Sequence, residues 1–251
     1  GQVTYQIDGV PVTDSYDGST VVDVNSSAVQ ELQVISGAFN AEYGQALSGV
    51  INLVTKDGGS DFHGSFQTYA GDYISIKSDV FWNIDDVDPI AIRNIEGSLS
   101  GPIVNEKLFF FTNFRYLYND GHIYGKRVYR PTDLAFELDA TGGEFAFVRD
   151  NTGQFLRDFS DAQESVNHKF VPMNWSENYF GQGKLTYRLF SGLKLSYNFL
   201  YDKRDYQEYD YGSYMLLTPD NNLNKFEESY SNIFAINHAI SASSFYTLNI
   251  S

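Results

Sequence analysis

The feature that most constrains the fold is a strict alternation of apolar and polar residues along several segments of the chain. In the clearest segment, from Gly192 to Asp202, every second residue is leucine, tyrosine or phenylalanine, and most residues between them are polar. A period of two is that of a β-strand, whose successive side chains point to opposite faces of a sheet. The sequence therefore predicts strands that have one apolar face and one polar face.

Seven segments share this alternation, and several are near the length that spans a bilayer at a tilt. They cover residues 66–70, 95–103, 108–118, 179–189, 192–202, 230–240 and 246–250. Asn232 and His238 interrupt the apolar face of the sixth segment. The pattern predicts a mainly β fold, a transmembrane antiparallel β-barrel of which about seven strands are present.

The connections between these segments alternate between long and short. Residues 72–92, 119–175 and 205–225 are long connections, whereas 102–107, 191–192 and 241–244 are short ones. Outer-membrane barrels show this alternation, because their periplasmic turns are tight and their outer loops are extended. Long loops without structure of their own are also uncommon in compact soluble domains. The loop lengths therefore support the barrel independently of the strands.

Composition agrees with a barrel and excludes several other classes. The hydrophobic content of 42% is ordinary for a soluble protein, as expected where polar lumen-facing residues dilute the average. The 19 tyrosines and 20 phenylalanines suit aromatic belts at membrane interfaces. No apolar run approaches the roughly 18 residues of a membrane-spanning helix. The absence of cysteine excludes disulfides and cysteine metal sites, and the net charge of -15 argues against nucleic acid as a partner.

The first 57 residues have a different, mixed character. Val3 to Ile7 alternates as a strand, and the run from Asp8 to Pro11 predicts a turn. Asn25 is a candidate helix cap before a short helical turn over residues 28–31, and residues 32–35 and 50–54 read as strands. So few apolar positions make a poor independent core, but the segment makes sense if it is seated inside a barrel.

Two motifs in this segment resemble the end of the plug domain of TonB-dependent outer-membrane receptors. The run from Ile7 to Val12 resembles a strand and turn of the plug, and the run from Phe39 to Asn52 looks most like the Oar-like branch of that family. The residues that carry the resemblance are Asp8, Gly9, Pro11, Gly37, Glu42, Tyr43, Gly44, Gly49, Asn52 and Thr55. The chain departs from many members at Gln33 and Ser36, where Glu and a basic residue are usual. Because Ser36 has no charge, an ion pair between plug and barrel that uses the basic residue at this position is not carried over from the resemblance.

The resemblance implies a domain organisation and a function. Residues 1–60 would be the C-terminal part of an α/β plug domain, and residues 61–251 the first strands of the barrel. Such a protein takes up a ligand across the outer membrane of a Gram-negative cell, and a TonB-type energy-coupling protein pulls on its plug. Its partners would be the outer-membrane lipid bilayer, the coupling protein and an unknown ligand. No cofactor is implied, and the chain is not expected to be an enzyme.

Orientation follows from this interpretation, because the plug lies on the periplasmic side of the first strand. The long loops then face the exterior, and five tyrosines are expected at the loop ends of their strands, where an outer aromatic girdle lies. They are Tyr116, Tyr118, Tyr179, Tyr201 and Tyr230. Plugged barrels need about 22 strands, and residues 1–4 lack the features of a signal peptide. We therefore expect the sequence to be a piece of a larger protein.

Two other functions remain open at this level. The barrel would serve in protein export, or as a structural partner in a surface complex, if it associated tightly with a surface lipoprotein or a secretion component. A soluble all-β binding module would carry polar residues on the outer faces of its strands, and its loops would not alternate in length. Both expectations go against the soluble module.

The most binding-like segment is the tyrosine-rich loop from Asp205 to Tyr214. Tyrosines give a large, stiff contact area, and carboxylates add charge selectivity. The candidate ligand contacts are Tyr206, Tyr209, Asp210, Tyr211 and Tyr214. The alternative is a solvated hairpin end that is rich in tyrosine.

Other motifs carry no clear chemistry. The four histidines have no partner at helical spacing, and the acidic run Asp85 to Asp88 lacks the spacing of a calcium loop. The run from Gly181 to Lys184 lacks the spacer and the following Ser or Thr of a phosphate loop. We interpret its glycines as positions where a strand bends or approaches a neighbour. No catalytic constellation is predicted, and no metal site.

Overall fold

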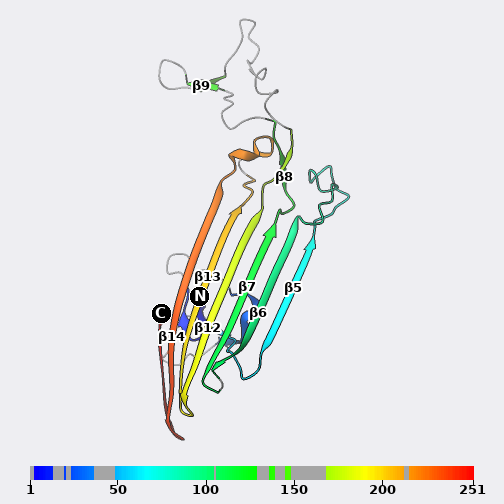
Figure 1. Ribbon diagram of the computed structural model, residues 1–251. Coiled ribbons are helices and arrows are strands. Elements are labelled where there is room, and N and C mark those ends of the chain that lie inside the picture. The colour runs from blue at the N-terminus through cyan, green and yellow to red at the C-terminus, as the bar shows by residue number, and fades with distance from the viewer. Residues whose placement is uncertain are drawn as a thin grey trace, which may run out of the picture.

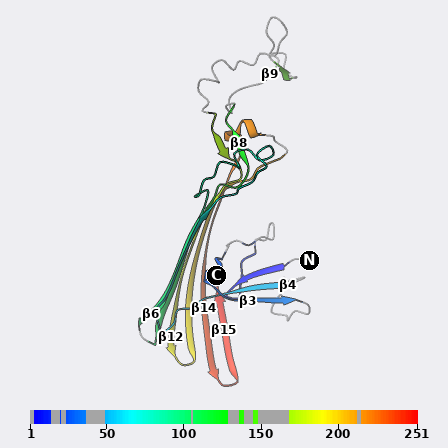
Figure 2. The same ribbon diagram turned by 90° about the vertical axis from the view of Figure 1, so that its right-hand side faces the viewer.

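The computed structural model describes residues 3–13, 20, 24–36, 49–104, 106–128, 136–138, 145–147, 168–211 and 215–251. Two sheets make up most of the molecule. A seven-stranded antiparallel sheet, called the large sheet, runs the length of the structure, and a four-stranded sheet, called the small sheet, lies against one of its faces (Figures 1 and 2).

The large sheet confirms the seven strands that the alternation predicts. Its spatial order is β15-β14-β13-β12-β7-β6-β5, so β5 and β15 are the edge strands. The strands are β5 (His63–Gly71), β6 (Ile92–Val104), β7 (Leu108–Asn119), β12 (Ser176–Phe190), β13 (Leu193–Gln207), β14 (Asn224–Ser241) and β15 (Ser244–Ile250). Long and short connections alternate between them as predicted, and the three long ones lie at the same end (Figure 1).

The register separates the two faces of the large sheet. Lys184 pairs with Asn198, and both side chains are buried on the face that the small sheet covers, which we call the inner face. The next pair, Leu185 and Tyr197, points to the opposite outer face, where both side chains are over 40% exposed. An outer face of exposed leucine, phenylalanine and tyrosine beside a polar inner face is the arrangement of a membrane barrel strand.

The two polar residues that interrupt the outer face have local partners. The hydroxyl of Tyr197 donates to Oδ1 of Asn232 at 2.7 Å. The ring of His238 stands edge-on to Phe190 and to Tyr246, with ring centroids 5.8 and 5.3 Å apart. His238 is therefore part of an aromatic group near the short turns, and Asn232 accepts a bond from a tyrosine of the neighbouring strand.

The predicted tyrosine girdle is only partly at the loop ends. Tyr116 and Tyr179 lie near the ends of β7 and β12, their rings 5.0 Å apart, and both hydroxyls donate to Glu177. Tyr201 and Tyr230 pair with each other well inside β13 and β14. The prediction is wrong for this pair because both strands continue, from 202 to 207 and from 224 to 229, as a polar ladder whose backbones remain paired.

The small sheet has the order β2-β1-β4-β3, with bounds β1 (Val3–Ile7), β2 (Val10–Pro11), β3 (Val29–Ser36) and β4 (Gly49–Thr55). β1 and β4 are parallel, whereas β2 and β3 run antiparallel to their neighbours. The predicted helical turn over residues 28–31 is instead a 3₁₀ turn, η1 (Ser26–Ala28), capped by Asn25. From Val29 onward the backbone pairs with β4, which replaces helical hydrogen bonds.

The long connections form a cap beyond the ends of the strands. β8 (Tyr124–Lys126) pairs with β11 (Phe170–Pro172), and two 3₁₀ turns, η2 (Met215–Leu217) and η3 (Pro219–Asn221), pack beside β8. Met173 is fully buried there, and Arg127 forms a two-pronged ion pair with Asp220 at 2.7 Å. The backbones of β9 (Phe136–Leu138) and β10 (Phe145–Phe147) pair farther out. Within the described ranges, no helix has the length and apolarity to cross a membrane.

Candidate functional site

The most developed polar site in the molecule lies where the small sheet meets the inner face of the large sheet. Asp8, at the turn between β1 and β2, accepts two hydrogen bonds from Thr55 at the end of β4, from N at 2.8 Å and from Oγ1 at 2.7 Å. From the large sheet, Lys184 Nζ lies 3.1 Å from Asp8 Oδ2 and 2.9 Å from Thr55 Oγ1, and Asn198 Nδ2 donates to Asp8 Oδ2 at 2.9 Å. Four donors thus converge on one carboxylate.

A second carboxylate, Asp57, extends this site toward the short turns. Its Oδ1 lies 2.9 Å from Lys184 Nζ, and its Oδ2 forms an ion pair with Lys194. Burial by itself raises the pKa of Asp57, but the two lysines outweigh burial and hold that pKa below its ordinary value of 3.8. Asp57 is therefore charged at neutral pH. We call Asp8, Thr55, Asp57, Lys184, Lys194 and Asn198 the seat cluster.

Next to the seat cluster, the chain passes very close to strand β7. Gly58 is buried, and a Cβ atom at this position would lie 2.3 Å from the carbonyl oxygen of Phe110. Only glycine fits where the backbone approaches another strand so closely. The linker is therefore fixed both by the charge of Asp57 and by the absence of a side chain at Gly58.

A third polar contact ties the turn η1 to the large sheet. Asn25 Nδ2 donates to Asn113 Oδ1 at 3.3 Å, and Asn113 Nδ2 donates to Ser27 Oγ at 2.9 Å. Asn25 and Asn113 are both buried. The cap of a local turn in the small sheet is thus also a bond to strand β7.

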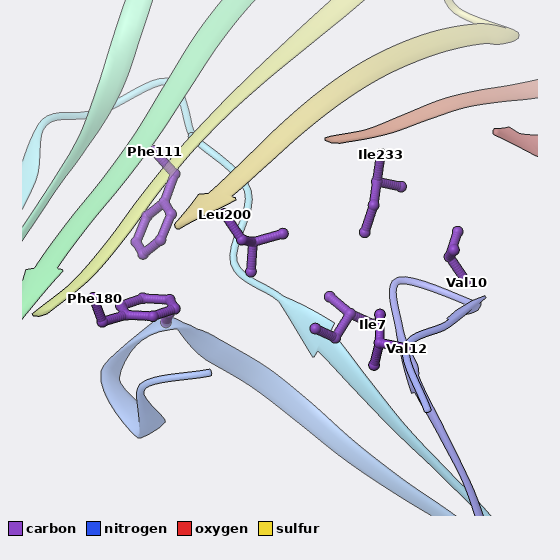
Figure 3. Packing of buried hydrophobic residues seen from close by; sticks show 8 residues of the cluster. Ile7, Val10, Val12, Phe111, Phe180, Leu200 and Ile233 are labelled. Carbon is purple, nitrogen blue, oxygen red and sulfur yellow. The ribbon is translucent and has the colours of Figure 1, made fainter. Parts of the chain in front are cut away.

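Apolar side chains from both sheets pack together between these polar contacts (Figure 3). The cluster comprises Ile7, Val10, Val12 and Ala28 of the small sheet with Phe111, Phe180, Leu200 and Ile233 of the large sheet. By itself the small sheet has too few apolar residues for a core, but four inner-face positions of the large sheet are apolar and lie opposite them.

The structure places the predicted plug-motif residues in different roles. Asp8 and Thr55 contact each other, and Gly9 N donates to Asn52 Oδ1 at 3.0 Å. Gly9 has a φ of 80°, which favours glycine. Pro11 is exposed and pairs with Gln6, and Gly49 pairs with Val3 and with Ser36. The other predicted residues, Gly37, Glu42, Tyr43 and Gly44, lie outside the described residues.

The predicted ligand loop lies partly against a cavity. A cavity of about 450 Å³ at the long-loop end is lined by several aromatic residues, among them Trp175, Tyr206, Tyr209 and Tyr211. Tyr206 is 7% exposed, its hydroxyl donates to Glu227 at 2.6 Å, and the guanidinium of Arg204 lies 4.2 Å from its ring centre. The two remaining candidates are Asp210, which belongs to the same loop, and Tyr214, which lies outside the described residues.

No group of three or more His, Asp or Glu with the geometry to hold a metal occurs among the residues that the structure describes. The backbone N of Asp88 donates to Asp72 at 2.7 Å, so part of the acidic run shapes its own loop. Burial and nearby carboxylates, Asp120 first, raise the pKa of Tyr124 to about 12.

Known proteins resemble this chain in sequence and in fold. No protein-family model matches it. A stretch of 116 residues is 29% identical to the TonB-dependent transporter Oar of Myxococcus xanthus and covers 44% of this chain and 11% of Oar. In sequence, this stretch of the chain is similar to part of a TonB-dependent transporter.

Solved structures related by fold agree with that relationship. The siderophore receptor PirA of Acinetobacter baumannii has a TM-score of 0.57 at 16% identity, over 99% of this chain and 31% of the receptor. The outer membrane transporter YddB of Escherichia coli has a TM-score of 0.55 at 12% identity, over 96% of this chain and 29% of the transporter. This chain therefore spans about a tenth of Oar and under a third of these structures. The descriptions are of transporters and receptors, in agreement with the expectation that the chain is not an enzyme.

The likeness to a TonB-dependent transporter does not by itself identify the residues of the seat cluster. Sequence reasoning placed Lys184, Lys194 and Asn198 on polar strand faces and Asp57 in a turn. It did not pair them. The available signal was the presence of lysines on the polar faces of two adjacent strands and of two aspartates in the first segment. Their pairing requires the tertiary contact, because Asp8 and Lys184 are 176 residues apart.

Proposed function

We propose that the small sheet is the C-terminal part of a plug domain and that the large sheet is the first part of the barrel it closes. The protein would act as a TonB-dependent receptor that takes up a ligand across the outer membrane of a Gram-negative cell. The seat cluster is the observation that carries this proposal. It joins the two sheets through a buried lysine, Lys184, and two carboxylates, Asp8 of the small sheet and Asp57 of the linker that follows it.

The chemistry of the seat suits a closed state that opens only under work. Separating a buried ion pair leaves charges without partners, and breaking such a pair costs about 3–5 kcal/mol. The apolar cluster adds to this cost. Contacts of this strength keep the small sheet in place against thermal motion, and a periplasmic energy-coupling protein would supply the work needed to displace it. The TonB-dependent relative supports a TonB-type partner for this role.

The remainder of the interface suits movement. Asn178 Oδ1 and Gln182 Oε1 are buried on the inner face without a hydrogen-bond partner among the described residues. Buried polar groups of this kind are usually satisfied by water. A hydrated interface exchanges protein partners for water at small net cost, so the ion pairs and the apolar cluster would hold most of the free energy of closure.

The outer end would provide the ligand contacts. The aromatic cavity beside Tyr206, Tyr209 and Tyr211 opens at the same end as the long loops. Large, stiff aromatic side chains form contacts at low entropic cost. Solved relatives are described as siderophore receptors, and the chemical identity of this protein's ligand does not follow from that likeness.

The test measures whether the seat seals the outer membrane. The intact protein that carries this chain is expressed in a Gram-negative host, and entry of vancomycin, which is too large for general porins, is measured as growth inhibition. We expect a variant with Lys184→Met and Lys194→Met to sensitise cells and the wild type not to. Lys203→Met is the matched control, because Lys203 pairs with Asp205 away from the small sheet. Equal sensitivity of the seat variant and the control, at equal amounts of folded protein, would contradict the proposal.

A further inference from the structure

The half of the large sheet nearer the short turns carries an unbalanced positive charge. This half begins at the pair Lys184 and Asn198 and ends at the short turns. Its strand segments, residues 63–64, 99–104, 108–111, 184–190, 193–198, 233–241 and 244–250, contain no aspartate or glutamate. They contain three cations, Lys184, Arg188 and Lys194.

The three cations lie on the same face. Alternation along β12 puts Lys184 and Arg188 on the inner face, and Arg188 pairs with Lys194 across β12 and β13. The register therefore gathers them into one strip that leads from the seat cluster to the short turns. At the end of this strip lies a cavity of about 520 Å³. Its charged lining residues are three cations, Lys107, Arg188 and Lys194, and one carboxylate, Glu106 of the short turn, so cations outnumber carboxylates there.

In the closed structure, the small sheet and the linker that follows it supply the counter-charges, Asp8 from the sheet and Asp57 from the linker. Asp8 and Asp57 neutralise Lys184, and Asp57 also neutralises Lys194. Arg188 has no carboxylate partner among the described residues, and its guanidinium lies 4.7 Å from the ring centre of Phe109. Displacing the small sheet together with the linker at Asp57 would therefore leave a strip of three cations, and the strand segments of this half of the sheet hold no compensating carboxylate.

We propose that this strip lines the path opened by displacement of the small sheet, and that it selects an anionic solute carrying carboxylate or phosphate groups. This inference rests on the proposed function, since it requires the small sheet to leave. A cleft lined by one sign of charge raises the local concentration of the opposite ion. Lys184 and Lys194 both contact Asp57, and Arg188 pairs with Lys194 across the strands, so these charges lie within the Debye length of about 8 Å at physiological salt and their fields overlap. Asp8 of the small sheet and Asp57 of the linker then act as tethered anions that occupy the strip in the closed state.

The experiment measures ion selectivity of the intact protein in a planar lipid bilayer, with potassium chloride as the probe. Urea is added until the small sheet, which has far fewer strand pairings than the large sheet, is loosened and current appears. The reversal potential in a salt gradient gives the ratio of chloride to potassium permeability. Three variants are compared with the wild type: the triple change Lys184→Gln, Arg188→Gln, Lys194→Gln; the single change Arg188→Gln; and Lys203→Gln.

We expect the triple change to lower the chloride-to-potassium permeability ratio by about twofold or more. Arg188→Gln should lower the ratio by less, and it does so without touching the seat cluster. Lys203→Gln removes the same charge from the outer face and should leave the ratio unchanged. A current whose selectivity is the same in the wild type and the triple variant overturns the inference and leaves the proposed function standing. If urea opens no current at all, the proposed function fails, and the inference fails with it.

Discussion

Lys184 allows the strength of the seat to be worked out from its contacts. Replacement by Met keeps the length and the apolar stem of the side chain and removes its charge. In the wild type the Lys184 side chain is 6% exposed, and its Nζ contacts Asp8, Asp57 and Thr55. The change therefore takes away the lysine partner of two carboxylates, Asp8 and Asp57, whose side chains are 13% and 26% exposed.

The expected loss follows from the partners that remain. Breaking a buried ion pair costs about 3–5 kcal/mol. Asp57 keeps Lys194, and Asp8 keeps its bonds from Thr55 and Asn198, so each carboxylate retains at least one donor. The loss should therefore lie at the lower end of that range, about 3 kcal/mol in the free energy of unseating the small sheet.

The assay follows the accessibility of one buried position on the inner face. Ser196 is 9% exposed and lies between Lys194 and Asn198, and the chain has no cysteine of its own. Ser196→Cys in the intact, detergent-purified protein is labelled with a maleimide across a urea series. With a denaturant slope of about 1 kcal/mol per M for a small element, a loss of about 3 kcal/mol from Lys184→Met should lower the labelling midpoint by about 3 M.

Two comparisons distinguish the loss of the Lys184 contacts from a non-specific loss of stability. Lys203→Met should leave the midpoint nearly unchanged, since Lys203 is 40% exposed and exposed ion pairs contribute at most about 1 kcal/mol. Asp8→Asn combined with Lys184→Met should cost less than the sum of the single changes, because the two side chains contact each other. Equal midpoints for Lys184→Met and Lys203→Met, or strict additivity with Asp8→Asn, would refute the reasoning.

Three further predictions use the same labelling assay or a close variant of it. The pKa of Asp57 is lowered in the folded protein, so the stabilisation by Asp57 is fully present above the unfolded pKa near 3.8 and is lost as pH falls through the lower folded pKa. When the pH is below about 4, the urea midpoint of labelling should therefore fall, and Asp57→Asn should remove this part of the decrease. Gly58→Ala should loosen the small sheet, since its Cβ would meet the backbone of Phe110 at 2.3 Å, whereas Gly59→Ala meets no atom within 4 Å; equal midpoints would show that the close approach is unimportant. Gly125→Ala should make the outer cap more sensitive to protease, because the new Cβ would lie 2.5 Å from the sulfur of Met173. Gly71→Ala, whose Cβ would meet no atom within 4 Å, should leave the cleavage rate unchanged. Equal cleavage rates for the two variants would contradict the packing of the cap.

Most of the large sheet could be predicted from sequence because each strand carries its own signal. Alternation along a strand depends only on that strand's two environments, so it survives without knowledge of its neighbours. The strand ends were harder to predict. The polar stretches from Lys203 to Gln207 and from Asn224 to Ser229 are paired strand, although their sequence lacks the apolar alternation. Their pairing comes from continuation of the ladder, which local sequence does not encode.

The seat cluster could be predicted only in part. Asp8 and Thr55 belong to a motif that the resemblance identifies, and the structure joins them by two hydrogen bonds. Lys184 was visible only as a polar residue in a strand, within a glycine-containing run that suggested close backbone approach. In the structure, a Cβ at Gly181 or Gly183 would meet no atom within 4 Å, so these glycines do not serve such an approach. The close approach occurs instead at Gly58, where the sequence carries no signal of it.

The most direct test of the account is whether the small sheet leaves the inner face in living cells. Ser196→Cys in the intact protein is exposed to a membrane-impermeant maleimide in growing cells of the native host, with and without a protonophore. Tyr211→Cys is the control, because position 211 is 70% exposed in the outer loops and its labelling shows that the maleimide reaches the cell surface. The account predicts that position 196 is labelled in energised cells and protected in uncoupled ones, while position 211 is labelled in both. Equal labelling of position 196 under both conditions would contradict a plug moved by energy coupling.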